Sequence, residues 1–579
     1  MKIKYTILFL FIFISHAYAQ ISPEQLPKPS PVQLAWHDME LTMFIHFGPA
    51  TWQDQEYDDL STPLSQINPT QLNTDQWADV AVSYGAKMII FCAKHTGGFV
   101  WWQTKTTDYG VKEIPWKQGK GDVLAELAAS CKKRGLKLGI YLSPEDRYLG
   151  AGMGGKIADP VKQKNYEQIY RKQLTELLTN YGDIYELWVD GSLVFNIEDL
   201  INKYATKAVI LQSTAATIRW VGNETGFAPY PAWNGIKEAD ARSGNSTASH
   251  SNPNGNVWLP IEVDVSIRRP TWFWKTWNEK NLLTVEELMR IYYSSVGRGC
   301  VFLINACPDT TGLIAPAETK RFAEFGEEIR KRFGTPIKET QGKGKELVLN
   351  LHSSKQIDHI LLMEDISQGE RIRKFTLEGK QGSDWKTIFQ GSAIGHKLIV
   401  QAYPRQFYET IRIVINESVG EPLIRKMAVY NTGTPPVEIP KVKDNWNLRH
   451  VGSWDITNNN AYLFDEKIDL TSYCTAAEQY ELAYVIKGGN IQDAIFSYDW
   501  ANTGKWEDNI KEKDRLIIEK VDLYFSGVES NQYLHSNQGF SNRIVFNLTG
   551  IPSELLVQTK IHIPAGLNGA QIEVYLLRK

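Results

Sequence analysis

Between Met43 and Phe333, short apolar segments alternate with longer amphipathic ones. The short segments have the length and the β-branched or aromatic content of buried strands: Met43–His46, Met88–Ala93, Leu136–Ser143, Ile184–Asp190, Ala208–Ser213, Val257–Val265 and Cys300–Ala306. The longer segments repeat apolar residues at helical spacing: Asp122–Arg134, Gln163–Tyr181, Thr284–Ser295 and Ala317–Phe333. Strands that alternate with helices predict a parallel sheet covered by helices.

These strands, with one more expected between residues 214 and 256, predict a (β/α)8 barrel. An open, doubly wound sheet is the alternative. Polar residues follow the carboxyl ends of many different strands, and a barrel gathers all of those ends around one mouth. We therefore favour the barrel, an α/β fold.

Length and composition limit the remaining possibilities. A chain of 579 residues is too long for a single core. The formal net charge of −3 comes from interspersed acidic and basic residues, so no basic stripe is available for a nucleic acid backbone. Most of the 18 Trp precede residue 300; many belong to the core, but indole faces are also what sugar rings stack on.

After Gly334 the pattern changes to strand-sized alternation. The segments 346–351, 359–363, 375–378, 385–389, 397–400 and 410–415 predict a β-sandwich. Asn431–Pro436 reads as a linker, and further strands follow it. We thus divide the chain into a barrel over residues 20–335, a first β-sandwich over 336–433 and a second β-rich domain over 434–579.

The first residues have the parts of a secretory signal: Lys2 and Lys4, the apolar run Tyr5–Ile14, and Ala17-Tyr18-Ala19. Cleavage after Ala19 gives an exported protein, periplasmic or secreted. The apolar run is too short for a membrane anchor. The five Cys are scattered, with no Cys-x-x-Cys, so we expect neither a disulfide framework nor a metal or other cofactor.

Two carboxylates in these strands have the chemistry that glycoside cleavage needs. One acid must be ionised to attack or to activate water, and a second must donate a proton to the leaving oxygen. Asp190 and Glu262 are the candidates. The alternative for each acid, taken alone, is a structural ion pair with a nearby Arg.

Several motifs resemble the α-L-fucosidases of glycoside hydrolase family 29. They run in order along residues 31–335: Met43-Phe-Ile-His-Phe-Gly48, Glu56-Tyr57, Ala86–Phe99, Leu138–Pro144, Leu187-Trp-Val-Asp-Gly191, Trp258–Arg268 and Ser295–Arg298. The segment around Glu262 is most similar to the branch that uses a Glu acid/base and prefers branched fucosyl linkages.

The resemblance implies a retaining exo-glycosidase acting on terminal α-L-fucosyl residues of glycans. Asp190 matches the family's nucleophile, and Glu262 would be the acid/base. The sugar-binding positions carry over to this chain as follows: His46, Glu56, Tyr57, His95, Tyr141, Trp188 and Arg268. Arg268 has a second reading as an ion-pair partner of Asp264 or as a loop anchor.

One departure from the family pattern affects the sugar. Relatives read His-His-Asp-Gly-Phe where this chain reads His95-Thr-Gly-Gly-Phe99, so a second sugar-binding histidine is missing. Losing one hydrogen bond changes affinity about tenfold per 1.4 kcal/mol. An α-L-galactoside or a β-galactoside is therefore an alternative substrate.

The β-domains leave a further alternative. Residues 357–377 resemble the discoidin-like, galactose-binding sandwiches that follow this barrel in relatives, and we expect that domain to brace the barrel. A barrel without activity that binds carbohydrate through its β-domains is the non-enzyme alternative.

Overall fold

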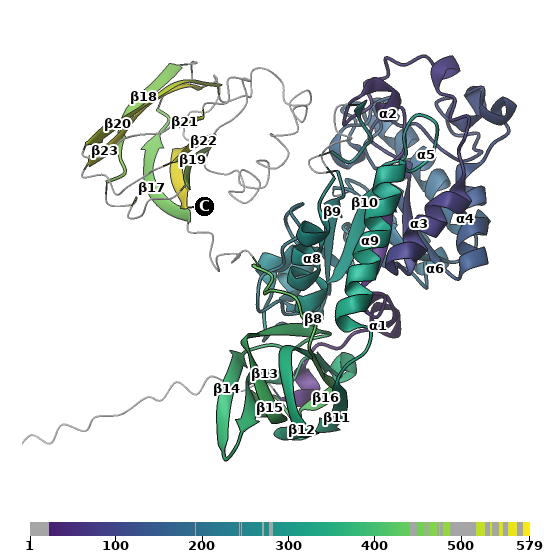
Figure 1. The fold of residues 1–579 in the computed structure, drawn as a ribbon. Helices are drawn as coiled ribbons and strands as arrows, with labels where there is room; N and C mark the ends of the chain where they lie inside the picture. Colours follow the sequence, from purple (N-terminus) through teal and green to yellow (C-terminus); the bar gives the residue numbers. More distant parts are fainter. Residues whose placement is uncertain are drawn as a thin grey trace, which may run out of the picture.

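The computed structural model describes residues 22–439, except 192, 243, 245, 269–270 and 277–281, and parts of 448–578. The expected signal peptide, residues 1–19, lies outside the described residues. Parallel strands form one sheet in the order β5-β4-β3-β2-β1-β10-β9-β6. A parallel bridge from Leu211 of β5 to Ile218, next to β6, joins the two edges. The predicted barrel is therefore confirmed, and the open sheet is excluded (Figure 1).

The barrel strands occur where the apolar segments predict them. They are β1 (Leu41–Ile45), β2 (Met88–Lys94), β3 (Lys137–Leu142), β4 (Ile184–Trp188), β5 (Val209–Leu211), β6 (Arg219–Trp220), β9 (Ile261–Ser266) and β10 (Val301–Ala306). The strand expected between residues 214 and 256 is β6. The predicted strand Val257–Val265 is instead two strands, because β8 (Val257–Trp258) leaves the barrel to pair with β7 (Gly235–Ile236).

The helices connect these strands and cover the sheet. They are α1 (Pro31–His37), α2 (Ala50–Gln53), α3 (Thr74–Tyr84), α4 (Val123–Arg134), α5 (Pro160–Asn180), α6 (Glu198–Tyr204), α7 (Glu238–Arg242), α8 (Val285–Ser294) and α9 (Pro316–Phe333). Local sequence sets their ends. The Asp122 side chain accepts from the backbone of Ala125 to begin α4, which ends at Gly135 in a left-handed conformation.

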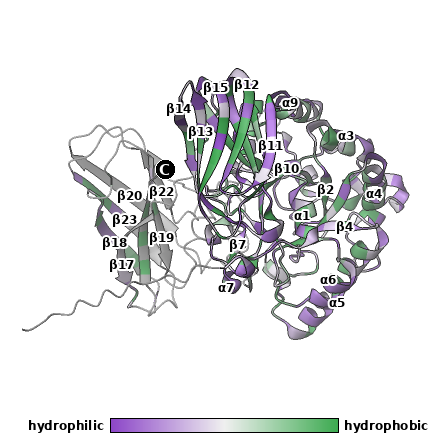
Figure 2. Ribbon diagram, turned by 90° about the horizontal axis from the view of Figure 1, so that it is seen from below, coloured by the Kyte–Doolittle hydropathy of each residue, from purple (hydrophilic) through white to green (hydrophobic). Residues whose placement is uncertain are grey.

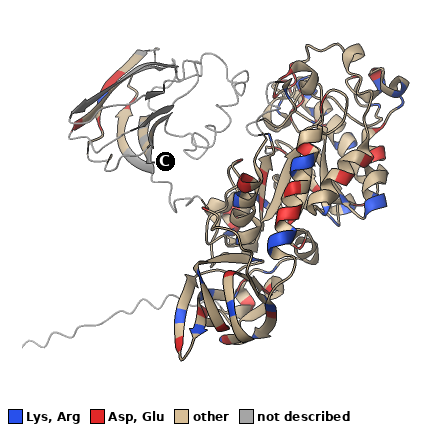
Figure 3. Cartoon of the chain, in the orientation of Figure 1, with Lys and Arg blue, Asp and Glu red and all other residues tan. Residues whose placement is uncertain are grey.

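The barrel core lies on both sides of the sheet. Every residue of β1, β2, β9 and β10 is buried, as expected for parallel strands enclosed between barrel interior and helices. Hydropathy follows the same layers in Figure 2, where the helices carry hydrophilic residues on their outer side. Charges of both signs alternate along α9 (Figure 3), where Arg332 pairs with Glu328 at 2.6 Å.

An antiparallel sheet follows the barrel, in the order β11-β16-β12-β15-β13-β14. Its strands are β11 (Lys338–Lys343), β12 (Glu346–Glu364), β13 (Ile372–Gln381), β14 (Asp384–Gly391), β15 (Leu398–Ser418) and β16 (Leu423–Tyr430). Two pairs of predicted strands are each one long strand: 346–351 and 359–363 both lie in β12, and 397–400 and 410–415 both lie in β15. One continuous core of Ile, Leu, Phe and Val side chains results.

Beyond residue 447 the described strands form two further sheets, in the orders β17-β24-β19-β22-β21 and β18-β23-β20. The strands are β17 (Leu448–Asp455), β18 (Tyr462–Asp469), β19 (Gln479–Ile486), β20 (Ile517–Ser526), β21 (Tyr533–Leu534), β22 (Arg543–Asn547), β23 (Glu554–Ile563) and β24 (Gln571–Arg578). This part is a second all-β unit.

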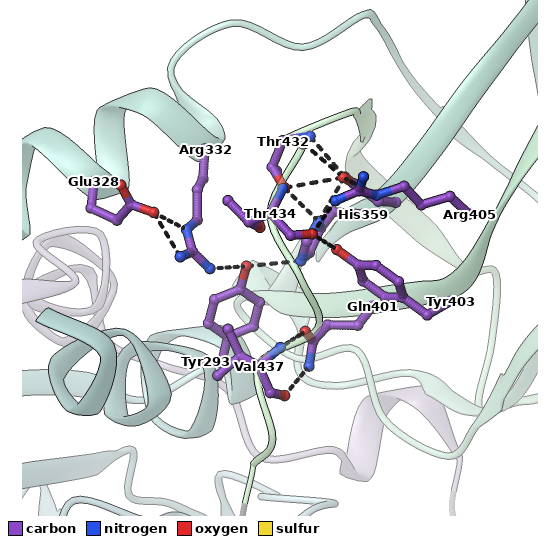
Figure 4. Close-up of polar contacts among 12 residues, drawn as sticks. Tyr293, Glu328, Arg332, His359, Gln401, Tyr403, Arg405, Thr432, Thr434 and Val437 are labelled. Carbon is purple, nitrogen blue, oxygen red and sulfur yellow. Dashed lines mark hydrogen bonds and ion pairs between the residues drawn. The ribbon is translucent and has the colours of Figure 1, made fainter.

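The predicted linker is fastened to the first sandwich (Figure 4). Buried Asp358 accepts hydrogen bonds from the backbone N–H groups of Thr432, at 2.8 Å, and Gly433, at 3.0 Å. His359 beside it contacts Tyr293 of α8 at 2.8 Å. Barrel, sandwich and linker therefore meet in one polar network.

Candidate functional site

Residues from the ends of four neighbouring strands, together with Tyr57 from the loop after α2, form one wall of the barrel mouth. The rings of Tyr57, His95, Tyr141 and Trp188 stack in sequence, with centroid separations of 5.9, 5.7 and 6.1 Å. The ring of His46 packs against this stack, 5.6 Å from His95. Five of the predicted sugar-binding residues are thus brought together, as the carboxyl ends of parallel strands require.

Asp190 lies two residues beyond the end of β4 and is partly exposed at this mouth. The Tyr141 hydroxyl donates to its Oδ2 at 2.9 Å. Burial raises the pKa of Asp190, while the hydrogen bonds from Tyr141 and from the Gly191 backbone favour the ionised form. The hydrogen bond from Tyr141 therefore orients a partly exposed carboxyl group at the mouth.

The two histidines of the wall are neutral bases. Nδ1 of His46 and Oδ1 of Asn305 are 2.8 Å apart, and burial lowers the pKa of His46 to about 4. Burial, together with the charges of His46 and Arg147, lowers the pKa of His95. A neutral imidazole has one donor and one acceptor nitrogen, which suits a sugar hydroxyl.

Several carboxyl groups influence the pKa of Tyr57, which lies on the loop after α2. Glu56 accepts from the backbone of Trp272 at 2.6 Å and pairs with Lys275 at 3.1 Å. Burial raises the pKa of Tyr57, and the charges of Glu56, Glu224, Asp190 and Glu145 raise it further. Four acids from four different loops therefore act electrostatically on one phenol.

Glu224 is the functional candidate that the sequence analysis missed. It follows β6 by four residues and is 5% exposed. Its turn is shaped by Asn223, whose Oδ1 accepts from the backbone N–H groups of Thr225, at 3.2 Å, and Phe227, at 3.3 Å. Once β6 is located at Arg219–Trp220, an acid just past its carboxyl end is an evident mouth residue.

Glu262 occupies a different place. It is the second residue of β9, so Asp264 and Ser266, on the same face of the strand, lie between it and the carboxyl end. Trp188 Nε1 donates to its Oε2 at 2.7 Å, and its carboxyl group hydrogen bonds to that of Glu186. Burial and the neighbouring Glu186 raise the pKa of Glu262.

The Glu186–Glu262 pair is enclosed by protein. Both residues have 0% exposure, and Trp36 Nε1 donates to Glu186 Oε2 at 2.6 Å. Oε1 of each Glu is buried without a donor among the described residues. A single proton held between the two carboxyl groups would satisfy both oxygens.

Arg268 is also buried within protein. Its Nε donates to Glu318 Oε2 at 2.6 Å, and both side chains are almost fully buried. The backbone N–H of Cys307 donates to the other oxygen of Glu318 at 2.8 Å. Arg268 thus links the end of β9 to α9. Its predicted contact with the sugar stays a prediction.

Within the described residues, no cluster of His, Cys, Asp and Glu has the arrangement of a metal site. None of the helices in that part of the chain is long and apolar enough to span a bilayer.

Comparisons with known proteins identify the family. A sequence profile of the α-L-fucosidases matches residues 46–332. Alpha-L-fucosidase 1 of Arabidopsis thaliana is 34% identical over 482 residues, covering 73% of this chain and 93% of the plant protein. The chain belongs to the α-L-fucosidase family.

Solved structures extend the match beyond the barrel. A crystal structure assigned to this activity from Bacteroides thetaiotaomicron has a TM-score of 0.66 and 31% identity, covering 70% of this chain and 99% of that chain. A glycoside hydrolase family 29 structure from a rumen bacterium has a TM-score of 0.64 and 26% identity, with 92% and 96% covered. The chain is thus a family 29 glycoside hydrolase, with a carbohydrate substrate.

The departure at Thr96 has a local explanation within this α-L-fucosidase. Thr96 Oγ1 is 3.2 Å from His95 Nδ1, so the hydroxyl contacts the retained histidine. Gly98 has φ of +95°, and a Cβ there would lie 2.2 Å from Asp146 Oδ1. Asp146 forms a buried ion pair with Lys94 at 3.1 Å. The following turn is therefore fixed by packing, while position 96 faces the sugar-binding wall.

Proposed function

We propose that the protein is an exported, retaining α-L-fucosidase in which Asp190 is the nucleophile and Glu224 the acid/base. The observation that supports this assignment is position: Asp190 and Glu224 follow the carboxyl ends of β4 and β6, which open at the same barrel mouth, and the charges of both act on Tyr57. Glu262, the acid/base expected from the sequence, is enclosed by Glu186 and Trp188. Glu224 is therefore the stronger candidate for a group that must reach the leaving oxygen.

The reaction then takes two displacements. In the first, the Asp190 carboxylate attacks the anomeric carbon while the bond to the leaving oxygen breaks and Glu224 gives that oxygen its proton. In the second, the Glu224 carboxylate takes a proton from water, and the water oxygen displaces Asp190. Fucose is released with its original anomeric configuration, and both acids return to their starting states.

Sugar binding is assigned to the stacked wall. His46 has Nδ1 occupied by Asn305, which leaves Nε2 for a ring hydroxyl. His95, Glu56 and Tyr57 offer further polar groups, and the Trp188 ring provides an apolar face for the sugar. These positions support fucose as the terminal sugar. With Thr96 in place of histidine, L-galactose is the second sugar we test.

Azide distinguishes the acids by stereochemistry. With an activated aryl α-L-fucoside, Asp190→Gly should give β-fucosyl azide, because azide replaces the nucleophile in one inverting step. Glu224→Ala should give α-fucosyl azide, because azide then attacks the covalent intermediate. Glu262→Ala should give no azide product. α-Fucosyl azide from Glu262→Ala, with none from Glu224→Ala, would transfer the acid/base assignment to Glu262.

The same protein tests the sugar. Hydrolysis of aryl α-L-fucoside, α-L-galactoside and β-D-galactoside is compared, with Asp190→Asn as the control. Higher kcat/KM for the fucoside supports the proposal, whereas preference for either galactoside contradicts it. Export is tested separately: cell fractionation and N-terminal sequencing should recover a protein that begins at Gln20.

A further inference from the structure

The acid Glu224 stands on a loop whose two ends are tied together. Arg219, at the start of β6, donates through Nη2 to the carbonyl of Trp233 at 2.5 Å and through Nη1 to that of Leu259 at 2.7 Å. Residues 219–234 therefore form a closed loop, here called the acid loop, with Arg219 at its base and Glu224 within it. We expect a displacement of the base to displace Glu224, because only four residues separate Glu224 from Arg219.

The barrel holds the upper part of this loop. The Ala228 backbone N–H donates to the carbonyl of Ser294 at 3.0 Å, and the Ser294 hydroxyl donates to the carbonyl of Gly226 at 3.2 Å. A Cβ at Gly226 would lie 2.6 Å from the Ile291 side chain, so the loop packs closely on α8. These contacts fix the position of residues 226–228 against α8.

The sandwich holds the base. Glu370, in the turn before β13, accepts from the Asn234 backbone N–H at 3.0 Å and from Asn234 Nδ2 at 2.8 Å. Both residues are at most 4% exposed. The Tyr230 hydroxyl donates to the carbonyl of Ala393, also in the sandwich, at 2.9 Å. The Arg373 guanidinium lies 4.6 Å from the Trp233 ring centre.

Charge also acts at this junction. Burial raises the pKa of Glu370 to about 7, while the cations Arg373 and Arg219, one from each domain, favour its ionised form. One sandwich carboxyl thus satisfies two buried donors of the acid loop and interacts electrostatically with the cation that closes it.

We propose that Glu370 is a positioning residue for catalysis: by clamping the base of the acid loop, the sandwich sets where the Glu224 carboxyl stands relative to the leaving oxygen. This inference rests on the assignment of Glu224 as the acid/base. It makes the sandwich part of the catalytic unit rather than a support for the barrel alone.

The test uses leaving groups that differ in their need for a proton. A dinitrophenolate leaves without protonation, whereas the alkoxide of methyl α-L-fucoside needs a well-placed acid. In Glu370→Ala, kcat/KM for the methyl fucoside should fall at least about tenfold, with less than about threefold loss on the dinitrophenyl fucoside. Glu370→Gln and Tyr230→Phe should change in the same sense by smaller factors.

A matched control is available in the same domain. Glu364 is also fully buried, and its Oε1 accepts hydrogen bonds from the backbone N–H groups of Arg371 and Ile372, both in the sandwich. Glu364→Gln should lower stability without changing the ratio of the two kcat/KM values. Thermal melting of each variant shows whether it folds. If Glu370→Ala does not fold, Glu370→Gln is compared with Glu364→Gln instead.

The outcomes separate this inference from the assignment beneath it. If Glu224→Ala shows the leaving-group dependence and the Glu370 variants lose activity equally on both substrates, the positioning role is wrong and the acid/base assignment stands. If Glu224→Ala itself shows no such dependence, both are overturned. A dependence in Glu224→Ala and in the Glu370 variants, absent in Glu364→Gln, supports both.

Discussion

Two pairs of acids occupy the same barrel in opposite surroundings. Asp190 and Glu224 lie beyond the ends of β4 and β6, and the charges of both raise the pKa of Tyr57. Glu186 and Glu262 lie within β4 and β9, fully buried, and hydrogen bond to each other. Height along the strand, rather than residue type, therefore distinguishes the pair beyond the strand ends from the pair enclosed within the barrel.

The largest contrast is expected when one acid of each pair is neutralised. Asp190→Asn removes the attacking oxygen's charge, so kcat/KM for an aryl fucoside should fall at least about a thousandfold. Glu262→Gln should lose less than about tenfold, because the side chain keeps its volume and a hydrogen-bonding oxygen. Steady-state kinetics on both variants measures the contrast, and comparable losses would remove the distinction between the pairs.

Trp188 connects the two pairs, since its indole N–H binds Glu262 and its ring stacks on Tyr141. Trp188→Phe keeps an aromatic face but leaves Glu262 Oε2 without its donor. We expect a loss of about 1–3 kcal/mol in unfolding free energy. Urea denaturation measures this loss, and an unchanged midpoint would mean that the indole hydrogen bond contributes little.

The interior pair also predicts a pH dependence of stability. Burial raises the pKa of both Glu186 and Glu262, so the folded protein retains a proton that the unfolded chain releases above about pH 4.5. Stability from this source is full at lower pH and is lost as pH rises through the raised pKa values, by up to about 1.4 kcal/mol per pH unit per proton.

Melting temperatures between pH 5 and 8 test this sign. The stability difference between wild type and the Glu186→Gln/Glu262→Gln double variant should shift against wild type as pH increases. His37 and His396, whose rings stack at 4.3 Å with lowered pKa values, act in the opposite direction but are present in both proteins. A pH-independent difference would contradict the shared proton.

The smallest effect on activity is expected from a substitution of Thr96 at the barrel mouth. Thr96→His restores the histidine of relatives beside His95, and we expect the ratio of fucoside to L-galactoside kcat/KM to rise by about tenfold or less. Competition between the two aryl glycosides in one reaction measures the ratio. A fall in the ratio would show that Thr96 already favours fucose.

The barrel was predictable because its strands are continuous apolar runs, as β2 and β10 illustrate. β6 was expected between residues 214 and 256 but could not be located there, because it has only two residues, and Glu224 was missed with it. The pattern placed Asp190 correctly at a strand end. It could not tell that Glu262 lies deep in β9, because acids at the two heights look alike in sequence.

The sandwich strands were divided too finely for a physical reason. Within β12, residues 352–355 are exposed, His352 has φ of +63°, and the pairing with β15 shifts between Asn350 and Lys355. An exposed polar stretch with an irregular residue has the composition of a turn. Only the pairing on both sides reveals that the strand continues.

The fastening of the linker decides where the chain can be shortened. Asp358 binds the backbone of Thr432 and Gly433, and Gln401 binds that of Val437 through its amide. A protein ending after residue 439 keeps every one of these bonds, whereas one ending at residue 430 leaves the buried Asp358 carboxylate, among its described partners, with His359 and Arg405 alone. A difference of nine residues in where the chain ends would therefore decide whether Asp358 keeps its backbone donors.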